Sequence, residues 1–407
     1  MIKLDVAHLF VEKYTKDYLL VDFVEEREFI YFRNSGDYLD TMRLDEKYEP
    51  TMLLFSHVGK LPLKEGDLFT IPMNLLIEMK YTDQANLYND NDLEERPMNI
   101  YRIFSNGEWI SELFKNNQAN KCNRLSRNFR EHIKETWPYG EPCSLNQLGS
   151  NFNLEVVDVG QGSTNLVYDD NTLTVFDCGA SMTYPESQCQ SILKGIRGLF
   201  SSSRTISLII SHWDCDHYNL LTVMDDNLMR QFCCVFVPPK ISTLTAKNVI
   251  KRLYKNCNYI RTFKPFPRMK KRKVGIHSVI KNHNYELYVG EMCSSINNSG
   301  LALAVKGVND FVILGADHSN YQVWDCIYPQ ISRGGYSTLN IVVPHHGGDC
   351  GKINVKHIAE HPGIAAISVG KNYYKHPQQK TIDEYENLGF EIRRTDWERK
   401  NIVIKIQ

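Results

Sequence analysis

The sequence lacks a long hydrophobic run. No stretch of its 407 residues approaches the roughly 18 consecutive apolar residues of a membrane-spanning helix. Its first stretch, MIKLDVAHLFVEKYTKDY, also lacks the uninterrupted apolar segment and the small-residue cleavage site of a secretory signal. These absences exclude a membrane partner and predict a cytoplasmic protein.

The sequence also lacks an excess of charge of either sign and a regular spacing of cysteines. The chain carries 47 Lys and Arg against 48 Asp and Glu, so its overall balance predicts no polyanionic partner, although a local cluster of charge could still bind one. The 11 cysteines are odd in number and irregularly spread, which favours a reducing compartment over a secreted protein.

The composition that remains is that of a globular protein with more than one domain. Hydrophobic residues make up 42% of the chain and charged residues 23%, which is enough for a real core. Residues 1–136 alternate apolar and charged positions, as in YLLVDFV, and predict a small β-rich domain. Residues 137–151 are rich in Pro, Gly, Ser and Asn and predict a linker. The role of the N-terminal domain is open, and a protein partner is one possibility.

From residue 152 onward, short β-branched runs alternate with helical patterns, which predicts an α/β layered domain over 152–407. Five of these runs end in polar side chains. The residues that follow or close them are Asp177, His212, Asp317, the pair His345 and His346, and the pair Lys371 and Asn372. Because ligands of layered α/β domains bind beyond the carboxyl ends of the strands, we expect these side chains to share one site.

The stretch SHWDCDH places His212, Asp214, Asp216 and His217 within six positions. Imidazoles and carboxylates suit zinc or manganese, and this many ligands exceeds the four of a closed structural zinc site. We therefore expect two divalent ions that activate a water molecule. The prediction gives His212 and Asp214 to one ion and Asp216 and His217 to the other. Asp317 bridges them, His345 or His346 completes the set, and Asp177 orients a ligand.

A simpler interpretation also exists for each residue alone, because a single Asp or His after a strand is usually a turn or cap residue. For Asp177 in isolation that interpretation is better, whereas the agreement of spacing and strand position across the whole set favours a metal site. Cys215 should point away from Asp214 and Asp216 and act as buried filler, and Trp213 should serve packing.

Read together, these motifs resemble the metallo-β-lactamase superfamily, and within it the hydrolase domain of the competence protein ComEC. The matching elements are DVGQGS (158–163), DCG (177–179), HWDCDH (212–217), GAD (315–317), PHHGG (344–348) and SVGKNYYKHP (368–377). The resemblance covers about residues 152–407 and implies an αββα sandwich with a dinuclear site and phosphodiesterase or nuclease activity. It makes Asp216, His346 and His376 catalytic candidates, and the last of these a proton donor or a phosphate contact.

The chain departs from the family at several positions. Asp214 stands at the second histidine of the superfamily's common motif, which makes the site richer in oxygen and manganese as plausible as zinc. Ser163 replaces the aspartate of the family's GQGD, and HHGG replaces HHGS. These changes leave the metal ligands intact but alter the expected substrate contacts, and the membrane channel of ComEC is absent.

A basic segment lies between the metal motifs. Residues 240–281 contain many Lys and Arg and no Asp or Glu, and the segment is densest at Lys270, Lys271, Arg272 and Lys273. These cations, with Lys371 and Asn372, are candidate contacts for a nucleic acid or nucleotide. The alternative is a solvated loop whose aromatic residues fill a core.

Three functions fit these observations. A phosphodiesterase or nuclease is favoured by the basic segment, since a neutral acyl substrate needs no cationic surface. A thioester, lactone or lactam hydrolase on the same scaffold is the second. The third is a protein-partnered effector, for example in a multi-gene defence system.

Overall fold

The computed structural model describes residues 6–24, 51–56, 58–72, 75, 101–104, 108–122, 144–200, 203–238, 241, 243–263, 266–268, 273–293, 295–355, 358, 360–372 and 374–407. The chain divides into two compact units. The first unit comprises Met1–Glu135, Thr183–Ser187 and Ile241–Val249, and the second comprises Thr136–Met182, Gln188–Lys240 and Ile250–Gln407. Much of the linker expected over 137–151 lies outside the described residues.

The first unit is β-rich, as predicted. Its sheet has the strand order β5-β3-β2-β1-β4-β6, and helix α3 (Glu108–Lys115) belongs to the same unit. The strands are β1 (Val6–Tyr14), β2 (Tyr18–Val24), β3 (Thr51–Ser56), β4 (Leu68–Pro72), β5 (Tyr101–Phe104) and β6 (Asn120–Lys121). Alternate residues such as Leu9 and Val11 of β1 pack with Leu19 and Val21 of β2 in an apolar core, which stabilises the sheet by removing that surface from water.

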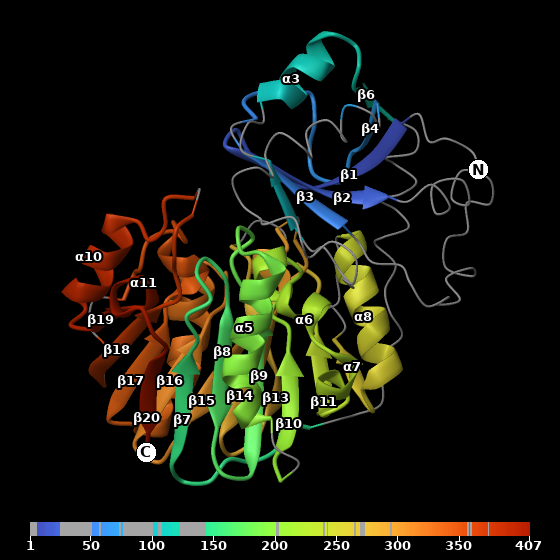
Figure 1. Cartoon of the computed structure of the whole chain (residues 1–407). Helices are drawn as coiled ribbons and strands as arrows, with labels where there is room; N and C mark the ends of the chain where they lie inside the picture. The colour runs from blue at the N-terminus through green and yellow to red at the C-terminus, as the bar shows by residue number, and fades with distance from the viewer. Residues whose placement is uncertain are drawn as a thin grey trace. The chain divides into compact units, whose positions relative to one another are not determined.

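The second unit contains two seven-stranded mixed sheets (Figure 1). The first has the order β12-β11-β10-β9-β8-β7-β20, and its strands are Ile260–Thr262, Phe232–Val237, Thr205–Ile209, Thr172–Cys178, Thr164–Tyr168, Phe152–Val156 and Ile402–Ile406. The second has the order β13-β14-β15-β16-β17-β18-β19, and its strands are Ile276–Lys281, Tyr285–Gly290, Leu301–Lys306, Asp310–Leu314, Thr338–Val342, His361–Ile367 and Glu391–Arg394.

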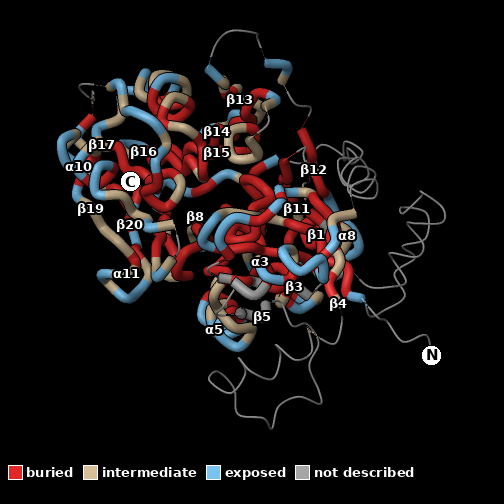
Figure 2. Tube along the Cα trace, turned by 90° about the horizontal axis from the view of Figure 1, so that it is seen from above, coloured by how far each residue is buried: buried red, intermediate tan, exposed pale blue. Residues whose placement is uncertain are grey.

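The two sheets face each other across a shared core. Phe176 and Phe236 of the first sheet belong to one buried cluster with Leu287 and Leu303 of the second. Thr174 of β9 and Tyr285 of β14 join the sheets through hydrogen-bonded hydroxyls 2.9 Å apart. In Figure 2 the strands β8, β14 and β15 run through this buried interior.

Helices cover the outer faces of both sheets. Helix α5 (Glu186–Ile196) lies in front of the first sheet (Figure 1) and buries Cys189, Leu193 and Ile196. On the second sheet, the π-helix η6 (Tyr321–Ile327), α9 (Tyr328–Ile331) and α10 (Gln379–Asn387) contribute to a separate apolar cluster with the strands. The predicted αββα sandwich is therefore confirmed for this unit.

The topology explains why polar residues collect at one edge. Strands β9, β10, β11 and β12 pair in parallel in the first sheet, and β16, β17, β18 and β19 do so in the second. Parallel neighbours end on the same side, so residues just past their carboxyl ends meet there. Among the helices in the described part of the chain, none combines the length and the apolar character that crossing a lipid bilayer requires.

Candidate metal centre

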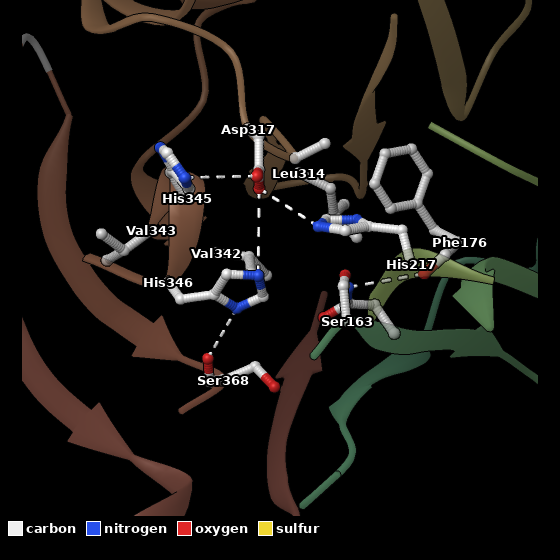
Figure 3. A pocket seen from close by; sticks show the side chains of 12 residues that line it. Ser163, Phe176, His217, Leu314, Asp317, Val342, Val343, His345, His346 and Ser368 are labelled. Carbon is white, nitrogen blue, oxygen red and sulfur yellow. Dashed lines mark hydrogen bonds and ion pairs between the residues drawn. The ribbon is translucent and has the colours of Figure 1, made fainter. Parts of the chain in front are cut away.

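A single carboxylate, Asp317, stands at the centre of the site, just beyond β16 (Figure 3). Its Oδ1 lies 3.3 Å from Nε2 of His217 and 4.0 Å from Nε2 of His346. Its Oδ2 lies 3.6 Å from Nε2 of His212 and 3.6 Å from Nε2 of His345. One aspartate thus offers each of its two oxygens to a different pair of imidazoles, which is the arrangement that a bridging ligand needs.

The other two predicted carboxylates join the same cluster. Asp214 Oδ2 lies 3.7 Å from His212 Nε2, and Asp216 Oδ2 lies 3.5 Å from His346 Nε2. Asp216 belongs to a short 3₁₀ turn, Cys215–His217, that follows β10 and folds the motif back on itself. All seven residues predicted as metal ligands therefore come within 4.0 Å of another member of the group.

Hydrogen bonds orient two of the histidines. His217 Nδ1 donates to Asp177 Oδ2 at 2.8 Å. The Ser211 hydroxyl donates to the same carboxylate at 2.9 Å, and it accepts from His212 Nδ1 at 2.9 Å. Nδ1 of each ring therefore carries a proton, and Nε2 is the nitrogen that faces Asp317. Asp177 holds a left-handed backbone conformation (φ 62°), and the whole group is buried.

His346 is fixed in the same way by the backbone. Its Nδ1 donates to the carbonyl oxygen of Ser368 at 2.9 Å, so that Nε2 is the nitrogen that faces the carboxylates (Figure 3). The Nε2 atoms of His212, His217 and His346 are buried and have no hydrogen-bond partner. Burying a polar atom without a hydrogen-bond partner costs free energy. Three such nitrogens beside carboxylates are therefore suited to bind a metal ion.

The side chains fit divalent metal ions in two overlapping groups. His212, His217 and Asp317 form one group, and Asp216, His217 and His346 form the other, with the ligand atoms of each within 4.8 Å of one another. The prediction from the sequence distributed the ligands between the two ions differently, because it gave His217 to the second ion alone. The turn at Cys215–His217 places His217 between the groups, a detail of side-chain direction that spacing alone does not contain.

Charge coupling is strong in this buried cluster. Burial alone would lower the pKa of His217, but the carboxylates of Asp317 and Asp177 outweigh burial and raise that pKa well above its ordinary value. Burial would raise the pKa of Asp317, but His345 and His217 hold it well below its usual range. In the metal-free site the protonated form of His217 and the charged form of Asp317 are therefore favoured, and a cation would replace the Nε2 proton of His217.

Local backbone features explain the motif residues around the ligands. A Cβ on Gly179 would collide with the backbone of Asp216 and His217, so the DCG element needs glycine at its last position. His345 and His346 both adopt a left-handed conformation, with φ of 52° and 53°. Such strain in two consecutive non-glycine residues is typical of functional sites, and here it brings both rings to Asp317.

His376 lies beside the ligand cluster. Its ring is 5.0 Å from the ring of His345, and its Nδ1 is buried without a hydrogen-bond partner. Asn372, expected to contact substrate, holds this loop instead. Its Nδ2 donates to the carbonyl oxygens of Gly370 and His376 at 2.7 and 2.9 Å, and its Oδ1 accepts from the His376 amide at 3.0 Å. The neighbouring Lys371 is exposed.

The basic segment is only partly described. Lys270, Lys271 and Arg272 lie outside the described residues. Lys273 is described, and its Nζ lies 4.8 Å from the centre of the Tyr321 ring at the start of η6. Tyr321 follows Asp317 by four positions in the sequence.

Several residues of the site escaped the sequence reasoning. Ser211 and Ser368 orient histidines, and Asn297 donates to Asp317 Oδ2 at 3.3 Å. Asn297 begins the stretch NNSGLALAV, directly before strand β15 (Leu301–Lys306). Trp213 and Cys215 are buried, as expected, and Trp213 packs on Tyr218 with ring centres 5.4 Å apart.

The fold and the His/Asp cluster define an αββα protein with a candidate site for divalent metal. No family model matches this sequence, and no curated protein does. Solved structures similar to it include the metallo-beta-lactamase fold protein YhfI from Bacillus subtilis, with 11% identity and a TM-score of 0.35 over 62% of this chain and 99% of that one.

Two further similar structures name different chemistries. One is a diphosphatase from the PhnP family, with 12% identity and a TM-score of 0.34 over 63% of this chain and 98% of that one. The other is CmlA, a diiron β-hydroxylase from Streptomyces venezuelae, with 11% identity and a TM-score of 0.36 over 70% of this chain and 57% of that one. Similarities this low decide no activity for this chain.

Asp177→Asn tests the orienting hydrogen bonds. An amide at this position presents either NH₂ or C=O to His217, so the imidazole is no longer held as a pure Nε2 ligand. We expect metal affinity to fall by about 10- to 100-fold, measured by competition with a chromophoric chelator. Asp170→Asn, in the exposed turn before β9, is the matched control and should not change affinity. Equal affinities for both variants would show that Asp177 does not position a ligand.

Proposed function

We propose that this protein is a metal-dependent hydrolase of phosphodiesters. The observation that carries the proposal is Asp317, whose two oxygens lie between the Nε2 atoms of four histidines. A bridging carboxylate holds two cations at a short separation, and such pairs clamp the attacking and leaving oxygens of a phosphoryl centre. The motif order, which resembles that of the ComEC-type hydrolase domain, supports the same chemistry.

Each residue then has a defined task. His212, His217 and Asp317 would hold one ion, and Asp216, His217 and His346 form the group that would hold the second. Zinc and manganese both suit these ligands, and the bound ions would lower the pKa of water toward neutrality. Ser211, Ser368 and Asp177 keep the imidazoles in the correct tautomer, so no reorganisation is needed during the reaction.

His376 is proposed to contact the substrate. Burial, with a smaller contribution from His345 and His346, lowers its pKa to about 4, and nearby cations would lower it further. The imidazole is therefore neutral at pH 7. We assign it as a hydrogen-bond donor to a phosphate oxygen, in preference to the proton donor that the sequence also allowed.

A phosphodiester fits better than a neutral acyl compound because of the local charge. Lys273 contacts Tyr321, four positions after Asp317 in the sequence, and belongs to a segment that contains no acidic residue from 240 to 281. Cations beside a metal site attract an anionic backbone and raise its local concentration. A nucleic acid or a nucleotide is therefore the proposed substrate class.

The proposal is tested with protein whose metal content has been measured. We expect bis-p-nitrophenyl phosphate to be hydrolysed after loading with manganese or zinc, and nitrocefin and an acyl thioester to remain intact. Hydrolysis of only the lactam or the thioester would overturn the phosphodiester assignment and leave the second candidate function. Loaded protein that turns over none of the three substrates would overturn the hydrolase itself.

His376→Gln probes the phosphate contact. Removal of one preorganised donor to a charged transition state typically costs about a hundredfold in kcat, and we expect a loss of that order with the metal content unchanged. His361→Gln is the control. It makes the same chemical change at the exposed start of β18, whereas the metal ligands lie beyond the carboxyl ends of the strands. A variant with native kinetics would exclude His376 from the reaction.

A further inference from the structure

Asn165 occupies a position where the fold calls for an apolar residue. It belongs to β8, a strand whose alternate residues face the core between the two sheets. Its neighbour two positions along, Val167, is part of that core with Phe176 and Leu314. Asn165 itself is only 1% exposed, so an amide side chain lies in the interior.

The hydrogen bonds of Asn165 fix which way its amide points. Its Nδ2 donates to Ser163 Oγ at 3.1 Å and to the carbonyl oxygen of Phe176 at 3.4 Å. A carbonyl only accepts, so the nitrogen must be on that side and the orientation is not interchangeable. The oxygen, Oδ1, is buried and has no hydrogen-bond partner. A core position with an unsatisfied acceptor indicates that something else completes it.

The candidate partner lies in the metal site. Asn165 and Ser163 line the same small cavity as His217, Asp317 and His346. Figure 3 shows Ser163 facing these ligands from the first sheet. Ser163 is held there by its backbone, since its amide donates to the carbonyl oxygen of Asp216 at 2.9 Å and its carbonyl oxygen accepts from the Gly179 amide at 2.9 Å.

Ser163 supplies the matching donor. Its Oγ accepts from Asn165, which leaves the hydroxyl hydrogen for another acceptor. The wall of the cavity opposite the second sheet therefore carries one acceptor, Asn165 Oδ1, and one donor, the Ser163 hydroxyl. A water molecule needs two to four such partners to be held in a buried site, and this pair with the ligand carboxylates meets that requirement.

We infer that Asn165 and Ser163 hold the reacting water of this site. The water donates one hydrogen to Asn165 Oδ1 and accepts the Ser163 hydroxyl hydrogen, which fixes its orientation relative to Asp317 and His346. Both residues are positioning residues, because they act through the water and not on the substrate. The inference rests on the proposed hydrolytic function for its catalytic consequence, whereas the water site itself does not depend on that function.

A crystal structure of the zinc-loaded protein tests the water site directly. We expect an ordered water within about 3.2 Å of Asn165 Oδ1, and its loss in Asn165→Leu, whose side chain has the same branching but no polar atom. A native structure in which Oδ1 faces an empty cavity, or bonds to a protein group, would overturn the inference whatever the enzyme hydrolyses.

Kinetic measurements test the effect of the water site on catalysis. For Asn165→Leu we expect kcat for the phosphodiester to fall by at least about tenfold, with KM within about twofold of the native value and the metal content unchanged. Asn153→Leu, on the neighbouring strand β7, is the matched control and should leave kcat unchanged. Native kcat in Asn165→Leu overturns the positioning role. A native protein without any hydrolytic activity would instead refute the proposed function and leave the crystallographic result to decide the water site.

Discussion

Replacing Asp317 with asparagine is expected to reduce metal loading below two ions and to abolish hydrolysis. The two carboxylate oxygens face different histidine pairs, and an amide can offer only one neutral oxygen in their place. Each ion would lose a charged ligand, and the positive charges would lose their shared counter-ion. A loss of about 4 kcal/mol of transition-state stabilisation corresponds to about a thousandfold in kcat/KM, and we expect at least that.

The control for this variant lies on the same strand. Asp310→Asn makes the identical chemical change at the other end of β16, away from the ligand cluster. Elemental analysis should find both metal ions in Asp310→Asn and fewer than two in Asp317→Asn. If Asp317→Asn kept two ions and more than a tenth of the native kcat/KM, Asp317 could not be the bridging ligand.

Much of the site was predictable because its ligands sit at strand ends. His212 and Asp317 each follow a run of buried β-branched and aliphatic residues, and parallel strands deliver such positions to one edge. The core between the sheets follows from the same alternation of residue types. These are properties of local sequence, so they can be predicted without coordinates.

The rest depends on contacts between distant parts of the chain. Ser368 orients His346 through its backbone carbonyl, which carries no side-chain signal at all. Asn372 has the polar character of a substrate contact, yet its three hydrogen bonds close its own loop. The unsatisfied oxygen of Asn165 is recognisable only when every neighbour is known. Side-chain direction and hydrogen-bond completeness are three-dimensional properties, and they decide which polar residues remain available for chemistry.

Metal removal should destabilise the protein by a large margin. A chelator leaves three buried Nε2 atoms beside Asp317 without the cation that they fit. At an ion concentration about a thousandfold above Kd, binding stabilises the folded state by about 4 kcal/mol. For a unit of this size that corresponds to a shift in Tm of roughly 10 °C, measurable by calorimetry with and without chelator. Asp317→Asn should show little of this shift, because it binds fewer ions in either condition.

The shift in Tm should also grow with pH. In the metal-free protein, the pKa of His217 is raised above its ordinary value of 6.5, so its ion pair with Asp317 stabilises the fold fully below that value. This stabilisation is lost as the pH rises through the higher pKa of the folded state. Metal binding needs the neutral imidazole and therefore strengthens over the same range. As the pH rises over this range, the chelated protein becomes less stable and the loaded protein more stable. The difference in Tm between them should therefore be larger at pH 8 than at pH 6. A difference that narrowed with rising pH would mean that protons and metal do not compete for His217.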